Sequence, residues 1–420
     1  MSIQTTTLKS GLRVITDTVT AVDSIALGVW AGVGTRHEDM AVNGVAHMVE
    51  HMLFKGTACR NAMQIAEEVE DVGGSINAYT SREITAYHIH VLKEHIGLAV
   101  DILADLVQNS TLPEDEIERE RKVILQEIGM SMDTPDDYVF DAYQETAYPD
   151  QALGAPILGK PKNIATMNRE ALYHYVQHCY TPSRLVISAA GNIQHDALVK
   201  MVEDAFCNLP QDQDVRTIAA RYQGGENRLE KPLEQSHVVL GFRSIGRHDD
   251  RYYSAVALSS ILGGGMSSRL FQEVREKRGL VYSVFSFNSA FDDDGQFAIY
   301  AGTGPERLQE LIPVVCDEIQ KIIVAPVSES ELARVKTQMR SNLLMARESM
   351  MTRAGQQAKH LVHFNHTLDL DKILSDIDAV NTDTIQKLAA LIFSSRPTLA
   401  GLGPLENLES YDQVCRRLAA

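Results

Sequence analysis

The two halves of this 420-residue sequence show the same order of predicted elements, and this repeat constrains the fold more than any other feature. An offset of about 215 residues aligns 112–128 with 327–343, and an offset of about 209 aligns 46–53 with 255–262. Self-similarity on this scale indicates two homologous domains. The length agrees, because one hydrophobic core rarely serves so long a chain.

We place the first domain at residues 1–210, a linker at 211–235 and the second domain at 236–420. The linker is polar and rich in turn-forming residues, with Gln-Asp-Gln-Asp, a Gly-Gly pair and a proline. At the aligned positions the second domain lacks every candidate metal ligand described below. We therefore expect only the first domain to hold a metal ion.

Strand and helix signals predict an α+β fold. Runs rich in β-branched residues at 13–16 and 24–30 favour strands, as does the run at 185–190. Amphipathic stretches near 94–108 and 114–132 favour long helices. Runs of strands alternating with pairs of helices indicate, in each domain, an antiparallel-rich sheet with helices packed on one face.

Composition is that of an ordinary globular protein, with 44% hydrophobic and 23% charged residues. The formal net charge of −17 disfavours nucleic acid and anionic membranes as partners. Five scattered cysteines without a C-x-x-C pair favour free thiols. Residues 1–9 show neither a signal nor a transit pattern, and no apolar run approaches the roughly 20 residues that span a bilayer. We therefore expect a cytoplasmic protein.

One short run carries most of the chemical information. His47, Glu50 and His51 form an H-x-x-E-H pattern within a mostly apolar stretch. Side chains four residues apart lie one above the other on a helix, so both imidazoles can point at one metal ion, with Glu50 beside them. Taken alone, the same pair is equally compatible with two hydrogen-bonded core histidines.

Two imidazoles make an incomplete site, because catalytic zinc usually has three protein ligands and leaves its fourth position to water. The best source of a third ligand is the stretch 114–132, whose acidic start after Pro113 is typical of a helix N-terminus. Glu120 and Glu127 are seven residues apart there and share one helical face. By itself, Glu127 would more often be an ordinary exposed carboxylate.

The triplet reverses the commoner H-E-x-x-H run and is the inverzincin pattern. With a glutamate 76 residues after His51, it resembles the pitrilysin family of zinc peptidases, in the branch of mitochondrial processing peptidase and its bacterial relatives. The resemblance implies that His47, His51 and Glu127 bind one Zn²⁺ per chain. It also implies that Glu50 is the general base, that Glu120 supports a ligand, and that the two domains face each other as a clamshell.

Two motifs of the second half resemble the same family's second-domain signature. Three glycines open the run 263–271, which lacks the spacing of a phosphate-binding loop. Arg275 and Tyr282 match the family's R-x-x-x-x-x-x-Y pair, and the resemblance implies that they bind the substrate or the tetrahedral intermediate, whose carbonyl oxygen gains charge. The alternative is that both residues only cap and pack a strand.

Two further resemblances concern the substrate. Residues 73–81 resemble the family's substrate-binding edge strand, which implies that Asn77 and Ala78 bind an extended peptide. Asp137 and Asp141, one helical turn apart, match acidic residues that recognise an arginine near the cut in processing peptidases. An ordinary strand and a solvated acidic helix start are the competing interpretations.

These features predict a zinc metalloendopeptidase that cuts extended, basic peptides. Relatives of this size imply a homodimer or pairing with a homologous subunit, and we expect neither nucleic acid nor membrane as partner. Some family members have lost the motif, so a non-catalytic or partner-dependent subunit of a peptidase complex is the first alternative. A zinc hydrolase on an unrelated fold is the second.

Overall fold

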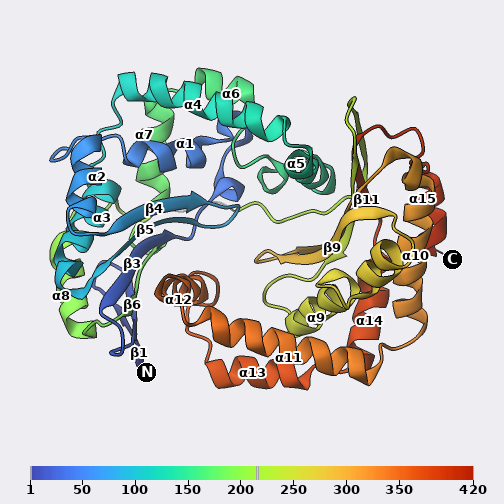
Figure 1. Cartoon of the computed structure of the whole chain (residues 1–420). Coiled ribbons are helices and arrows are strands. Elements are labelled where there is room, and N and C mark those ends of the chain that lie inside the picture. Colours follow the sequence, from blue (N-terminus) through green and yellow to red (C-terminus); the bar gives the residue numbers. More distant parts are fainter. Residues whose placement is uncertain (1, 214, 216, 420) are drawn as a thin grey trace. The chain divides into compact units, whose positions relative to one another are not determined.

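The computed structural model of the protein describes residues 2–213, 215 and 217–419, which form two compact units (Figure 1). Unit 1 comprises Met1–Gly129, Ala155–Ile218 and Leu344–Leu368. Unit 2 comprises Met130–Gly154, Ala219–Leu343 and Asp369–Ala420. Residues 214 and 216 of the predicted linker lie outside the described residues.

Unit 1 is built on a six-stranded sheet in the order β1-β2-β6-β3-β5-β4. Its strands are β1 (Ser2–Thr7), β2 (Arg13–Thr18), β3 (Ser24–Ala31), β4 (Ser75–Thr80), β5 (Thr85–Leu92) and β6 (Leu185–Gly191). Neighbouring strands are antiparallel except β2 and β6, which run parallel. β4 is an edge strand, so its backbone pairs with β5 on one side only.

Helices cover both faces of this sheet. The helices of unit 1 are α1 (Val45–Leu53), α2 (Ala62–Glu70), α3 (Ile96–Asn109), α4 (Glu114–Met132), α6 (Pro161–Thr166), α7 (Arg169–Cys179), α8 (His195–Ala205) and α12 (Met350–Phe364). Leu27 and Val29 of β3 belong to the larger core, whereas Ala26 and Trp30 pack with α12 on the opposite face. Because both sets of alternate residues in the central strands are apolar, both faces need cover.

Unit 2 has a five-stranded sheet in the order β7-β11-β8-β10-β9. Its strands are β7 (Gly225–Glu230), β8 (Ser236–Ser244), β9 (Val281–Ala290), β10 (Gly295–Thr303) and β11 (Thr398–Gly403). β7 and β11 are parallel and the other pairs are antiparallel. This order and these directions repeat those of β2-β6-β3-β5-β4 in unit 1, which supports the repeat seen in the sequence.

The main helices of unit 2 are α5 (Pro135–Ala147), α9 (Tyr252–Gly263), α10 (Leu308–Val324), α11 (Glu329–Ala346), α13 (Leu370–Ala379), α14 (Thr382–Phe393) and α15 (Tyr411–Ala419). α9, α10 and α14 share the larger core with one face of the sheet. α5 packs on the other face through residues such as Val139 and Tyr143. The prediction of an α+β fold is confirmed, with one difference: each sheet carries a helix on its second face as well.

The units are not continuous in the sequence. α5 belongs to unit 2 although it lies within residues 1–210, and α12 belongs to unit 1 although it lies within 236–420. The exchange is symmetric, because each helix directly follows the long helix α4 or α11 of its own half. The domain boundaries expected from the sequence differ from the compact units at these helices, since apolar periodicity does not show which sheet a helix covers.

The segment predicted as a linker contains a strand. β7 pairs in parallel with β11, beginning at Gly225 opposite Thr398. Gly224 and Gly225 have φ angles of +67° and +141°, which glycine adopts readily, so the chain can turn into the strand there. An edge strand needs few apolar side chains, and β7 is largely polar. For this reason the sequence pattern did not predict it as a strand.

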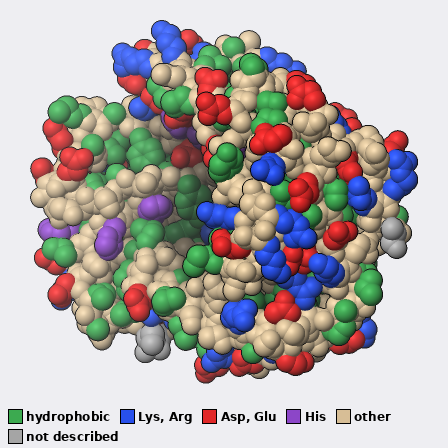
Figure 2. All heavy atoms as spheres, turned by 45° about the vertical axis from the view of Figure 1, so that its right-hand side comes forward, with side chains coloured by type: hydrophobic (Ala, Val, Ile, Leu, Met, Phe, Trp, Pro, Cys, Tyr) green, Lys and Arg blue, Asp and Glu red, His purple; other side chains and the backbone are tan. Residues whose placement is uncertain are grey.

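Charged groups of both signs are spread over the molecular surface that Figure 2 shows. On this face the net negative charge therefore does not form one continuous acidic surface. Within the described part of the chain, no helix combines the length and the apolar character needed to cross a membrane.

Candidate metal-binding site

The H-x-x-E-H run lies on α1, as predicted. This helix is mostly buried and begins after Gly44, whose φ of +99° places it in the left-handed region. A Cβ atom at Gly44 would lie 2.7 Å from the Cα of Gly159, so glycine is required for this close approach as well. The start of α1 is thus fixed by backbone geometry at Gly44.

A buried carboxylate anchors the same helix end. Glu38 accepts hydrogen bonds from the backbone N–H groups of Gly44 at 2.9 Å and Ala46 at 2.8 Å, and from the Asn43 amide at 2.9 Å. A negative group is favourable at a helix N-terminus. Burial raises the pKa of Glu38 to about 7, although these three hydrogen bonds oppose the rise.

Glu38→Ala is expected to lower the free energy of unfolding by about 2–4 kcal/mol, because two buried backbone N–H groups lose their acceptor and the Asn43 amide loses one of its two. Denaturant unfolding followed by circular dichroism measures the change. Glu67→Ala, an exposed position on α2, is the matched control and should change stability little. Equal stability of the two variants would contradict the capping role.

Three side chains from α1 and α4 meet within unit 1. The ligand atoms of His47, His51 and Glu127 all lie within 4.8 Å of one another. Glu127 Oε2 is 3.8 Å from His47 Nε2 and 3.7 Å from His51 Nε2. The imidazole rings are 4.7 Å apart at 72°, so they do not stack on each other.

The cluster fits a zinc ion. Ligands about 2.0–2.1 Å from a tetrahedral zinc ion lie roughly 3.4 Å from each other, close to the separations found here. Glu127 Oε2 is buried and has no hydrogen-bond partner among the described residues. Burial, together with electrostatic repulsion from His51, lowers the pKa of His47 to about 4. The imidazole is therefore kept in the neutral form that binds metals.

Glu50 lies beside the two histidines without belonging to the ligand group. Burial raises the pKa of its carboxyl, while the Thr80 hydroxyl and His51 counteract part of the rise. Its Oε2 atom is buried and unpaired within the described part of the chain. A carboxylate with an unpaired oxygen next to a candidate metal-ligand cluster is placed to accept a proton.

Glu120 contacts one of the histidines, a point that the sequence left open. Its Oε2 lies 2.8 Å from His51 Nδ1, and its Oε1 lies 2.7 Å from Lys55 Nζ. Although burial raises the pKa of Glu120, the hydrogen bonds with Lys55 and His51 outweigh it, and the pKa is lowered. A carboxylate on Nδ1 leaves Nε2 of His51 directed at Glu127, as for a metal-binding imidazole.

Lys55 and Glu38 also belong to the surroundings of the site, although no sequence pattern identified them. A signal for Lys55 existed: it follows His51 by four residues, the spacing of neighbours on a helix, although α1 ends at Leu53 and Lys55 lies in the turn beyond it. Glu38 precedes α1 in a short loop, and its distance from the helix start gives no recognisable capping pattern. The first contacts Glu120, and the second fixes the end of α1.

Asn77 and Ala78 lie on the edge strand β4, next to α1 in the contacts of unit 1. Asn77 is exposed, and its side-chain oxygen accepts a hydrogen bond of 2.8 Å from the backbone N–H of Ala78. The free side of β4 leaves backbone groups available for an added strand.

Arg275 and Tyr282 belong to unit 2 and are not part of the cluster in unit 1. Arg275 lies on the π-helix Phe271–Glu276, with its guanidinium 4.9 Å from the Phe271 ring centre. Tyr282 is 66% exposed on the edge strand β9. Such exposure argues against the alternative in which Tyr282 only packs a strand into the core.

Asp137 and Asp141 also belong to unit 2, where they lie on α5 as predicted one turn apart. Asp137 is exposed and Asp141 is half-buried. Pro135 opens this helix, and Asp137 in its first turn also suits the positive end of the helix dipole. The location is thus compatible with both interpretations drawn from the sequence.

Fold and cluster define the class of protein: a two-unit α+β protein with a His-His-Glu cluster that could hold a metal ion. The family model described as "Insulinase (Peptidase family M16)" matches residues 13–161, and that of the "Peptidase M16 inactive domain" matches residues 166–339. The chain therefore belongs to the M16, or pitrilysin, family of peptidases.

Relatives carry names of one kind. A protein of Rickettsia felis named "uncharacterized zinc protease" is 42% identical over 94% of this chain and 96% of its own length. A Bacillus subtilis protein named "uncharacterized zinc protease YmxG" is 37% identical over 96% of this chain and 99% of its own. The crystal structure of a protease from Helicobacter pylori has the same fold, with a TM-score of 0.90 and 24% identity over 96% and 99% of the two chains.

Proposed function

We propose that the protein is a zinc-dependent endopeptidase of the inverzincin type. The observation that carries the proposal is the convergence of His47, His51 and Glu127, with an unpaired oxygen of Glu50 among the described residues beside them. The names of the relatives support the same class of activity. The alternative, a subunit that binds no metal, does not explain why His47, His51 and Glu127 lie so close together.

The chain's own residues account for the steps of hydrolysis. Zinc, when bound, supplies a Lewis acid that polarises the scissile carbonyl and makes water more acidic. Glu50 accepts the proton of the attacking water and returns it to the departing amine. Glu120 holds His51 in the orientation and tautomer that suit metal binding. Arg275 and Tyr282 are proposed to stabilise the charge that develops on the substrate oxygen.

We propose an extended, basic peptide as substrate. The free edge of β4 can pair with a peptide backbone at Asn77 and Ala78 without requiring a particular sequence. Asp137 and Asp141 provide two carboxylates at helical spacing, which suits a guanidinium group. A neutral peptide should therefore be cut more slowly than the same peptide with an arginine.

Removal and return of the metal test this function. Treatment with a chelator should abolish cleavage of an unfolded basic peptide, and stoichiometric zinc should restore it. Mass spectrometry of a digested basic peptide library then gives the preferred residues around the cut. A protein that binds one zinc ion per chain yet cuts no peptide would instead favour the non-catalytic or partner-dependent subunit.

We also propose a homodimer, or a pair with a homologous subunit, in the cytoplasm. The cysteines form no disulfide in the described structure, which supports a reducing compartment. Light scattering of the purified chain distinguishes a homodimer from a monomer that awaits another subunit.

A further inference from the structure

Lys55 is the last member of a chain of contacts that leads to the proposed metal ion. Glu120 from α4 uses one oxygen for His51 and the other for Lys55, at 2.8 and 2.7 Å. The Glu120 side chain is only 8% exposed, and that of Lys55 is 29% exposed. Because the Glu120 carboxylate is largely shielded from water, its contact with Lys55 helps to fix its orientation.

The loop that carries Lys55 is tied to the beginning of α4. The loop follows α1, and Gly56 has a φ of +131° that favours glycine. The Ala58 N–H donates to the Asn109 carbonyl, and the Thr111 N–H donates to the Gly56 carbonyl, both at 3.1 Å. These bonds hold the loop against the segment that leads directly into α4, the helix of Glu120 and Glu127.

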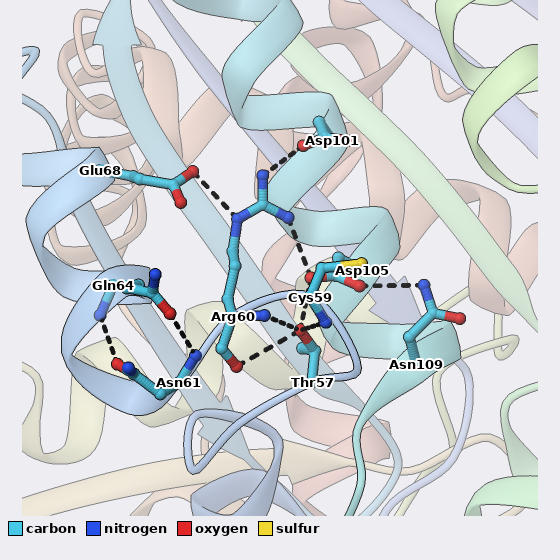
Figure 3. Close-up of polar contacts among 9 residues, drawn as sticks. All are labelled: Thr57, Cys59, Arg60, Asn61, Gln64, Glu68, Asp101, Asp105 and Asn109. Atoms are coloured by element: carbon cyan, nitrogen blue, oxygen red, sulfur yellow. Dashed lines mark hydrogen bonds and ion pairs between the residues drawn. The ribbon is translucent and has the colours of Figure 1, made fainter.

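Arg60 anchors the far end of the same loop (Figure 3). Its guanidinium contacts carboxylates of two helices: Glu68 of α2 at 2.9 Å, Asp105 of α3 at 2.9 Å, and Asp101 of α3. Asp105 also accepts a hydrogen bond of 2.6 Å from the Thr57 hydroxyl. The Arg60 side chain is 13% exposed, so its guanidinium is largely shielded from solvent where it contacts these carboxylates.

We infer that Lys55 is a positioning residue for the metal site, held in place by Arg60. The inference rests on the proposed function, since it concerns the binding of zinc by His51. Lys55 fixes the Glu120 carboxylate, Glu120 fixes the His51 ring, and the Arg60 contacts fix the loop from which Lys55 extends. Residues that hold a metal ligand in this way contribute about 10- to 100-fold to metal affinity.

Lys55→Met keeps the length of the side chain and removes its charge. It is expected to weaken zinc binding about tenfold, the lower end of that range, because Lys55 is one contact further from the metal. Competition with a chromogenic chelator measures the dissociation constant, with thermal unfolding of the metal-free protein as a check on folding. Lys55→Arg should restore most of the affinity.

Lys93→Met is the matched control, because Lys93 forms an exposed ion pair of 2.8 Å with Asp23 elsewhere in unit 1. This variant should bind zinc like the unsubstituted protein. If Lys55→Met also does so, the inference is overturned while the proposed function stands. If the unsubstituted protein takes up no zinc, both fall.

A double-mutant cycle tests the part of Arg60. Arg60→Met should weaken zinc binding several-fold when Lys55 is present and less than about twofold in the Lys55→Met background, because both residues act along one path. Additive effects would show that Arg60 stabilises the loop independently of Lys55, and would overturn that step of the inference.

Discussion

Glu50→Gln is expected to bind one zinc ion per chain while its turnover of a basic peptide falls by at least about 100-fold. A general base contributes about 10²- to 10⁴-fold to such a reaction, and an amide cannot accept the proton of the attacking water. The side chain of Glu50 lies outside the ligand group of His47, His51 and Glu127, so the metal site keeps its donors. Metal analysis and steady-state kinetics on the same preparation separate the two effects.

Glu67→Gln on the exposed face of α2 is the control for the loss of one glutamate, and it should retain full activity. Persistent turnover in Glu50→Gln at an equal zinc content would mean that another group accepts the proton. Loss of zinc in this variant would mean that Glu50 contributes to metal binding.

His51→Ala is expected to lose both zinc and activity. The substitution removes one of three ligands and also leaves the Glu120 carboxylate without its partner on α1. We expect stoichiometric zinc to be absent after dialysis and peptide cleavage to fall to the level of the chelator-treated protein. Inductively coupled plasma mass spectrometry gives the metal content.

His174→Ala is the matched control, because His174 is exposed on α7 outside the cluster. It should keep both properties. Full zinc content in His51→Ala would place the metal elsewhere in the chain and contradict the proposed ligand set.

Local periodicity was sufficient to predict most of unit 1. The predicted helix at 114–132 is α4, and the strands expected at 13–16, 24–30 and 185–190 lie within β2, β3 and β6. Helical spacing also predicted that the two histidines share a face and that Glu120 and Glu127 share another. These patterns depend only on the spacing of residues within one helix or strand, so they can be recognised in a single sequence.

Contacts between distant segments could not be predicted in the same way. The choice of His51 as the partner of Glu120 depends on how α4 packs on α1, which spacing within either helix does not determine. The exchange of α5 and α12 likewise depends on which sheet face remains uncovered. Glu38 caps α1 from a loop whose path follows from the tertiary structure.

Anomalous diffraction at the zinc absorption edge, from crystals of the zinc-loaded protein, would locate the metal ion and so test the proposed ligands. We predict one anomalous peak per chain, within about 2.0–2.2 Å of His47 Nε2, His51 Nε2 and a carboxylate oxygen of Glu127. A peak bound by other residues, or none at these three side chains in protein that contains stoichiometric zinc, would contradict the account.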